Sequence, residues 1–167
     1  MANTFELISS YAATGSVSSI SFTSIPSTYT DLVLKVSART THLSDDAVVI
    51  KFNGSSSTYS MRRLDGNGSS ASSDNNTTNI RGVTNDAGKT ASTFGSWEIY
   101  IPNYAGSTNK SASLDAVSEN NATAASAQLV AGLWSTTSAI TQIDLTSFNA
   151  ANFVIYTTAY LYGVKNA

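Results

Sequence analysis

Near the end of the chain, the stretch NFVIYTTAYLYGV (residues 152–164) alternates between two kinds of side chain. Successive side chains of a β-strand point to opposite faces of a sheet. One face would carry Phe153, Ile155, Thr157, Ala159 and Leu161. The other face would carry Val154, Tyr156, Thr158, Tyr160 and Tyr162. The stretch therefore predicts one long strand, with its first face in the core and a tyrosine stripe on its second.

The same alternation recurs along the chain and is clearest at residues 31–39. There Leu32, Leu34, Val36 and Ala38 alternate with polar residues, which is typical of a half-buried antiparallel strand. Roughly ten such segments are separated by turns, and no helical period is sustained. We therefore expect an all-β fold: a single-domain antiparallel β-sandwich over residues 1–167, with almost no helix and a jelly roll as its architecture.

Two local features refine this expectation. Asn53-Gly54 is the dipeptide best suited to a type I′ turn, so we expect a hairpin that joins strands at 48–52 and 58–64. Residues 65–92 are mostly Gly, Ser, Asn, Asp and Thr. This part predicts a long polar surface excursion, interrupted by one weak strand near 78–83.

The amino-acid composition disfavours or excludes several classes of function. The chain is 41% hydrophobic but only 12% charged, against roughly 25% in ordinary soluble domains. With a net charge of −2 and no basic patch, nucleic-acid binding is disfavoured. The absence of cysteine excludes disulfides and thiolate metal sites.

No stretch has the length of apolar sequence that a membrane helix needs, and the first residues lack the pattern of a signal peptide. The abundance of Ser, Thr and Asn nevertheless resembles that of proteins that work outside cells. A protein made in a host cytoplasm and released in a virus particle satisfies both observations. We therefore expect a virion location without a membrane partner.

Catalytic and metal-binding signals are weak. His42 is the only histidine, and no Gly-x-Ser-x-Gly motif occurs, so a hydrolase triad is not supported. Asp65 begins a segment like a calcium loop, but the pattern fails after Asn67. Glu98 and Glu119 are the glutamates in mid-chain from which a glycosidase pair could be built. We expect a non-enzymatic protein that needs no cofactor.

The remaining candidate site is a set of tyrosines: Tyr100, Tyr156, Tyr160 and Tyr162. Tyrosine is enriched at protein interfaces because its ring buries area while its hydroxyl finds a partner. We expect these residues to form an interface. A platform for stacking a glycan, or exposure without any partner, are the alternatives.

Three segments carry a resemblance: IPSTYTDL (25–32), GLWS (132–135) and AYLYGV (159–164). In them the chain resembles small virion-associated, jelly-roll-like β-sandwich structural proteins of tailed bacteriophages, especially marine ones. The resemblance implies a fold and a virion setting, and it transfers no catalytic or binding residue.

From these observations we expect a capsid decoration or cement protein that acts by contacts with other virion proteins, such as the major capsid protein or tail proteins. A homo-oligomer is the expected assembly. The alternative function is a tail or fibre module that binds a host receptor or glycan.

Overall fold

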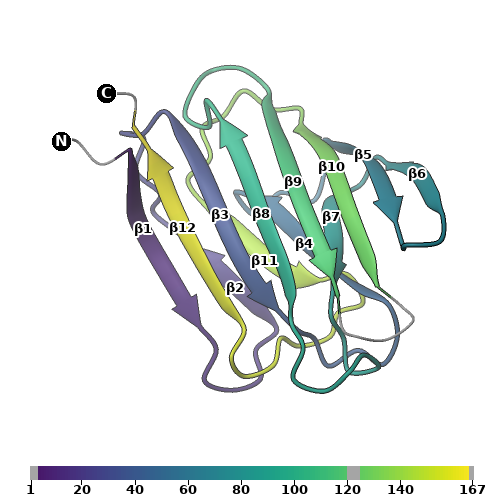
Figure 1. Ribbon diagram of the computed structural model, residues 1–167. Helices are drawn as coiled ribbons and strands as arrows, with labels where there is room; N and C mark the ends of the chain where they lie inside the picture. The colour runs from purple at the N-terminus through teal and green to yellow at the C-terminus, as the bar shows by residue number, and fades with distance from the viewer. Residues whose placement is uncertain (1–3, 120–124, 166–167) are drawn as a thin grey trace.

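The computed structural model describes residues 4–119 and 125–165 and has two antiparallel sheets that lie face to face (Figure 1). In spatial order, the eight-stranded sheet contains β1 (Phe5–Ala12), β12 (Thr158–Val164), β3 (Asp31–Ala38), β8 (Gly95–Pro102), β9 (Lys110–Ser118), β10 (Ser126–Trp134), β5 (Tyr59–Gly66) and β6 (Ala71–Asn76). The four-stranded sheet contains β2 (Ser19–Phe22), β11 (Ile143–Ser147), β4 (Asp46–Phe52) and β7 (Ile80–Thr84). The predicted all-β sandwich is confirmed, with twelve strands in the described residues instead of about ten. These residues contain no helix, and hence none that could cross a membrane.

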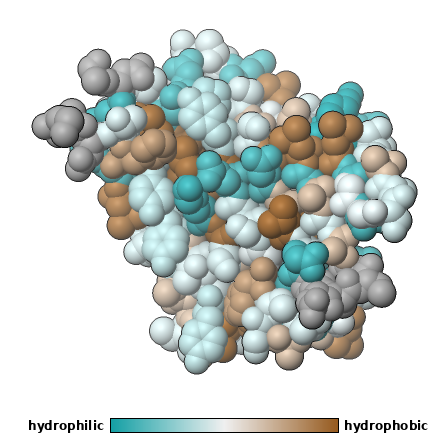
Figure 2. Space-filling view, in the orientation of Figure 1, coloured by the Kyte–Doolittle hydropathy of each residue, from teal (hydrophilic) through white to brown (hydrophobic). Residues whose placement is uncertain are grey.

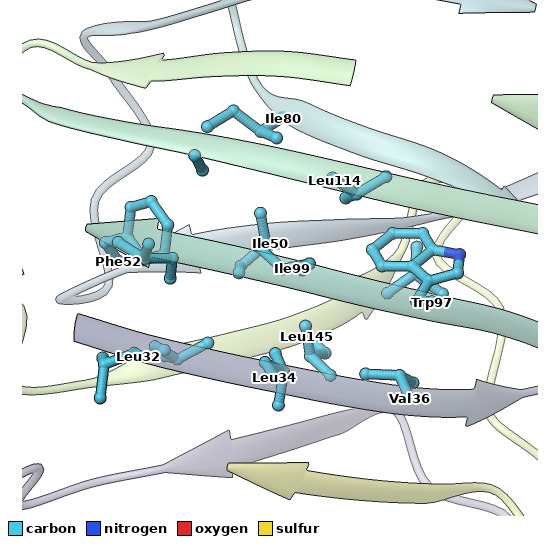
Figure 3. Packing of buried hydrophobic residues seen from close by; sticks show 14 of the residues in the cluster. Leu32, Leu34, Val36, Ile50, Phe52, Ile80, Trp97, Ile99, Leu114 and Leu145 are labelled. Carbon is cyan, nitrogen blue, oxygen red and sulfur yellow. The ribbon is translucent and has the colours of Figure 1, made fainter. Parts of the chain in front are cut away.

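The core lies between the two sheets. On β3, Leu32, Leu34, Val36 and Ala38 are buried as their alternation predicts. Figure 3 shows Leu34 close to Leu145 of the opposite sheet, within one continuous hydrophobic cluster. Burial of such side chains is the main stabilising contribution to a fold of this kind.

The sheets approach most closely where β7 packs on β9 and β10. A Cβ on Gly82 of β7 would lie 2.7 Å from the Cβ of Ala116, and a Cβ on Gly132 of β10 would lie 2.7 Å from Ile80 Cδ1. Real Cβ atoms do not come so close to their neighbours. Glycine at these two positions therefore allows β7 to lie directly against the larger sheet.

The last strand is shorter than the alternation predicts, since β12 begins at Thr158. Residues 154–157 form a turn, closed by a 3.2 Å hydrogen bond from Thr157 N to Val154 O, in which Tyr156 has a φ of +73°. The predictions that Phe153, Ala159 and Leu161 are buried are confirmed. The prediction that Ile155 faces the core is wrong, because this side chain is on the turn and is 43% exposed.

The Asn53-Gly54 turn is confirmed, but the hairpin is wrong. Both residues have a positive φ, of 52° and 67°, and Ser55 N donates to Phe52 O at 2.9 Å. The flanking strands nevertheless enter different sheets: β4 pairs with β7 and β11, whereas β5 pairs with β6 and β10. The turn therefore carries the chain from one sheet to the other.

The polar stretch at 65–92 has more regular structure than its composition predicts. The weak strand is confirmed as β7, whose Ile80 is fully buried. A second strand, β6, was not predicted, because its residues Ala71–Asn76 are polar and almost entirely exposed. It is formed by pairing with β5 and extends the larger sheet at its edge (Figure 1).

Candidate interaction surface

Most of the tyrosines predicted to form an interface lie on the outer face of the eight-stranded sheet. In Figure 1 this sheet lies in front, and no described segment crosses it. Figure 2 shows the same face as separate hydrophobic areas around a hydrophilic cluster. We call it the outer sheet face. Its exposed large apolar and aromatic side chains are Phe5, Leu7, Leu64, Tyr100, Val117, Leu129 and Tyr160.

Strand register places three of the four predicted tyrosines on this face. Tyr162 and Tyr100 flank Val33 from the two neighbouring strands, and Tyr160 lies beside Lys35. Directly opposed residues of an antiparallel pair have Cβ atoms about 4.5–5.5 Å apart, so these side chains are neighbours. Tyr156 does not join them, because the turn before β12 removes it from the sheet and leaves it 72% exposed.

The phenol of Tyr100 is held in place on the face. Its hydroxyl donates to Asp31 Oδ2 at 2.7 Å, and this hydrogen bond to a carboxylate raises the pKa of Tyr100 above its usual value. Asp31 also accepts from Asn103 N at 2.8 Å, so the strand end and the following loop are tied together. The ring of Tyr100 is thus a fixed part of the face.

A shallow groove of about 410 Å³ crosses the middle of the face beside Tyr160. Lys35 Nζ and Glu98 Oε2 form a 2.8 Å ion pair in it, and the hydrogen bond to Glu98 raises the pKa of Lys35. Asp115 lies opposite Glu98 on the next strand. The groove therefore combines one aromatic ring with donors and acceptors of hydrogen bonds.

The other sequence candidates lie elsewhere. Glu119 follows the end of β9, four residues beyond Asp115 and so about 13 Å further along the strand from the partner of Glu98, at about 3.3 Å per residue. The two glutamates do not form a pair across a cleft. His42 lies in a loop, where its Nδ1 contacts the backbone of Ser44.

The segment that begins at Asp65, whose sequence resembles only the start of a calcium loop, is part of a strand and a turn. Asp65 belongs to β5 and accepts a hydrogen bond from Ser126 Oγ at 2.9 Å. Asn67 Oδ1 accepts from the backbone N of Ser69 and Ser70. Within residues 4–119 and 125–165, no three His, Asp or Glu side chains are grouped as metal ligands would be.

The fold and the face together define a β-sandwich with a broad, weakly charged sheet surface. Such a surface can bury area against another protein or stack on a ligand, and the described residues show no catalytic grouping on it. Comparison of the chain with models of protein families, with curated proteins and with solved structures finds no match.

Proposed function

We propose that this chain is a non-enzymatic structural protein of a bacteriophage particle and that it decorates or cements the capsid by docking its outer sheet face on another virion protein. The observation that supports the proposal is the character of this face: large side chains on β1, β5, β9, β10 and β12 are exposed in separate hydrophobic areas around a hydrophilic cluster. Interfaces between proteins that also exist apart combine apolar and polar areas in this way.

The size of the face fits a stable contact. Eight strands about 4.8 Å apart, with about eight residues each at about 3.3 Å per residue, give an area on the order of 1,000 Å². A stable interface buries about 800 Å² per partner. Burial of the apolar part of this face would contribute about 25 cal/mol per Å², which opposes the free energy lost on association.

We also propose that the sandwich has the topology of a jelly roll, and the strand order supports this. Without the four strands β5, β6, β9 and β10, the sheets have the orders β1-β12-β3-β8 and β2-β11-β4-β7. The chain then changes sheet at each step except from β4 to β7, as in a jelly roll of eight strands. In this description the four additional strands widen only the sheet that carries the outer sheet face.

Purified particles test the proposal. Mass spectrometry is expected to find the chain in virions at a copy number that matches capsid sites, and its absence from particles would refute the proposal. In co-sedimentation with particles that lack the chain, Leu129→Glu on the outer sheet face is expected to abolish binding. The matched control is Ser19→Glu, an exposed position on β2 of the other sheet, which is expected to bind as wild type does.

A tail or fibre module that binds a glycan is the second candidate. It is favoured by the groove in which the Tyr160 ring lies beside Lys35, Glu98 and Asp115. In a glycan array, Tyr160→Ala would then remove the signal, while Tyr156→Ala, outside the sheet, would not. Binding to particles without any array signal would leave only the first candidate.

A further inference from the structure

A second pocket, of about 500 Å³, lies apart from the outer sheet face, where β5 meets β7 at the side of the sandwich. The chain has few charges, nine Lys and Arg plus eleven Asp and Glu, yet six of these twenty line this one pocket. They are Asp45, Asp46, Arg63, Asp65, Arg81 and Lys89. This concentration of charged groups in one concave site points to a polar ligand.

The fold holds several of these groups in place. Arg63 and Asp65 point to the inner side of β5, because Arg62 and Leu64 occupy the alternate positions. Gln128 of β10 donates to Asp65 Oδ2 and accepts from Val83 N of β7 at 2.9 Å. One glutamine therefore connects the two strands that form the walls of the pocket.

The cationic side of the pocket has unused hydrogen-bond donors. Each guanidinium carries five N–H groups. Arg81 lies over the ring of Phe148 at 4.1 Å and donates to Asn79 Oδ1 at 3.3 Å, while Arg63 donates to Asp74 Oδ2 at 2.7 Å and has a buried Nε without an acceptor. Burial, and then the positive charge of Arg63, lower the pKa of Arg81. An anionic group beside the two guanidiniums would reduce this repulsion.

The other side of the pocket presents acceptors. Asp65 is held by Ser126 and Gln128, Asp45 forms a 2.8 Å ion pair with Lys89, and Asn67 lies nearby. Carboxylates in these positions would accept hydrogen bonds from hydroxyl groups. An acidic peptide side chain has no hydroxyl groups beside its carboxylate to donate to these acceptors, so it is a poorer fit than a sugar acid.

We propose that this pocket binds a carboxylate-bearing sugar, a uronic acid unit of an acidic polysaccharide, with its carboxylate on Arg63 and Arg81 and its hydroxyls on Asp65 and Asp45. The volume of the pocket lies within the range of roughly 300–1,000 Å³ that is usual for small-molecule sites. The inference does not depend on docking of the outer sheet face, because the pocket lies on the opposite side of β5.

Isothermal titration calorimetry of the full chain tests it, with oligogalacturonate and oligoglucuronate as probes and their methyl esters as uncharged counterparts. The acids are expected to bind and the esters to bind at least about tenfold more weakly, since a charged carboxylate forms stronger hydrogen bonds with a guanidinium than a neutral ester does. Arg81→Gln is expected to cause a similar loss, which Arg81→Lys restores in part.

The control variant is Arg62→Gln, the neighbouring arginine on the opposite face of β5, which is expected to bind as wild type does. Leu129→Glu, a change on the outer sheet face, is a second control and is expected to bind the acids as wild type does. Failure of the docking proposal and failure of this one are therefore distinguishable. No binding of either acid would refute the proposal, and so would an equal loss in Arg62→Gln. Equal binding of a polyglutamate peptide would refute the assignment to a sugar. The comparison of acid with ester on the wild-type chain remains decisive should Arg81→Gln not fold.

Discussion

Replacement of Asp46 is expected to destabilise the sandwich more than any change to an exposed carboxylate. Asp46 is 3% exposed at the start of β4. Its Oδ2 accepts from the hydroxyls of Thr40 and Ser147, both at 2.7 Å. Its Oδ1 accepts from Ala47 N at 2.8 Å and from the side chain and backbone of Asn149 at 3.2 and 3.3 Å. One carboxylate thus connects three separate parts of the chain.

The size of the effect follows from these bonds. Asp46→Ala leaves buried donors without an acceptor, at about 1–3 kcal/mol for each one that finds no other partner. Since the hydroxyls can rotate to other acceptors, we expect a total loss of about 3–5 kcal/mol, a large part of the 5–15 kcal/mol typical of a domain. Asp46→Asn keeps one acceptor oxygen and is expected to lose about 1–2 kcal/mol.

Urea unfolding followed by the fluorescence of the buried Trp97 and Trp134 measures the free energy of unfolding. Asp144→Ala is the control: this carboxylate also accepts hydrogen bonds, from Ser21 and Gln142, but it lies on the exposed side of β11. It is expected to lose less than about 1 kcal/mol. An Asp46→Ala chain as stable as this control would show that packing alone holds the three segments together.

Three further outcomes are expected. Gly163→Ala should lower the free energy of unfolding by about 1–3 kcal/mol, because its Cβ would lie 2.2 Å from Tyr29 Cγ. In urea unfolding, the double variant with Tyr29→Ala should recover part of this loss. Tyr156→Gly should not lower the melting temperature, because the left-handed φ of +73° costs a tyrosine about 1 kcal/mol and the ring is exposed. A lower melting temperature would show that the ring makes a stabilising contact. Burial raises the pKa of Tyr104 above its usual 10.0, so the folded state retains a proton that the unfolded chain releases, and stability should fall as the pH rises through 10. The free energy of unfolding of Tyr104→Phe, measured on either side of that pH, should fall less; an equal fall would assign the effect to other groups.

The alternation of apolar and polar residues predicted burial correctly where a strand is paired on both sides and the opposite sheet covers one of its faces. β3 follows the pattern because β12 and β8 flank it on both sides and the four-stranded sheet covers its inner face. The pattern failed before Thr158, where the chain turns instead of pairing over its whole length, so that an apolar Ile155 is exposed. Local chemistry fixed the Asn53-Gly54 turn, but strand pairing depends on contacts distant in sequence, which that dipeptide does not encode.

The candidate sites also contain one part that alternation along a strand predicts and another part that depends on the order of strands in the sheet. The tyrosines at 160 and 162 share a face by simple alternation, whereas the placement of Tyr100 beside them requires the order β12-β3-β8. The charged pocket could not be predicted, because its residues come from several separate parts of the chain. Its one sequence signal was Arg62-Arg63, and alternation along a strand separates these two arginines instead of making them a pair.

This separation on β5 makes the two proposed surfaces independently testable. Arg62 and Leu64 belong to the outer sheet face, whereas Arg63 and Asp65 line the pocket behind it. Because alternate residues of β5 point to opposite faces, we expect the effects of substitutions on the two kinds of binding to be additive. A chain with both Leu129→Glu and Arg81→Gln is then expected to show the loss of each single variant and no more. A larger or smaller combined loss would mean that docking and ligand binding are coupled.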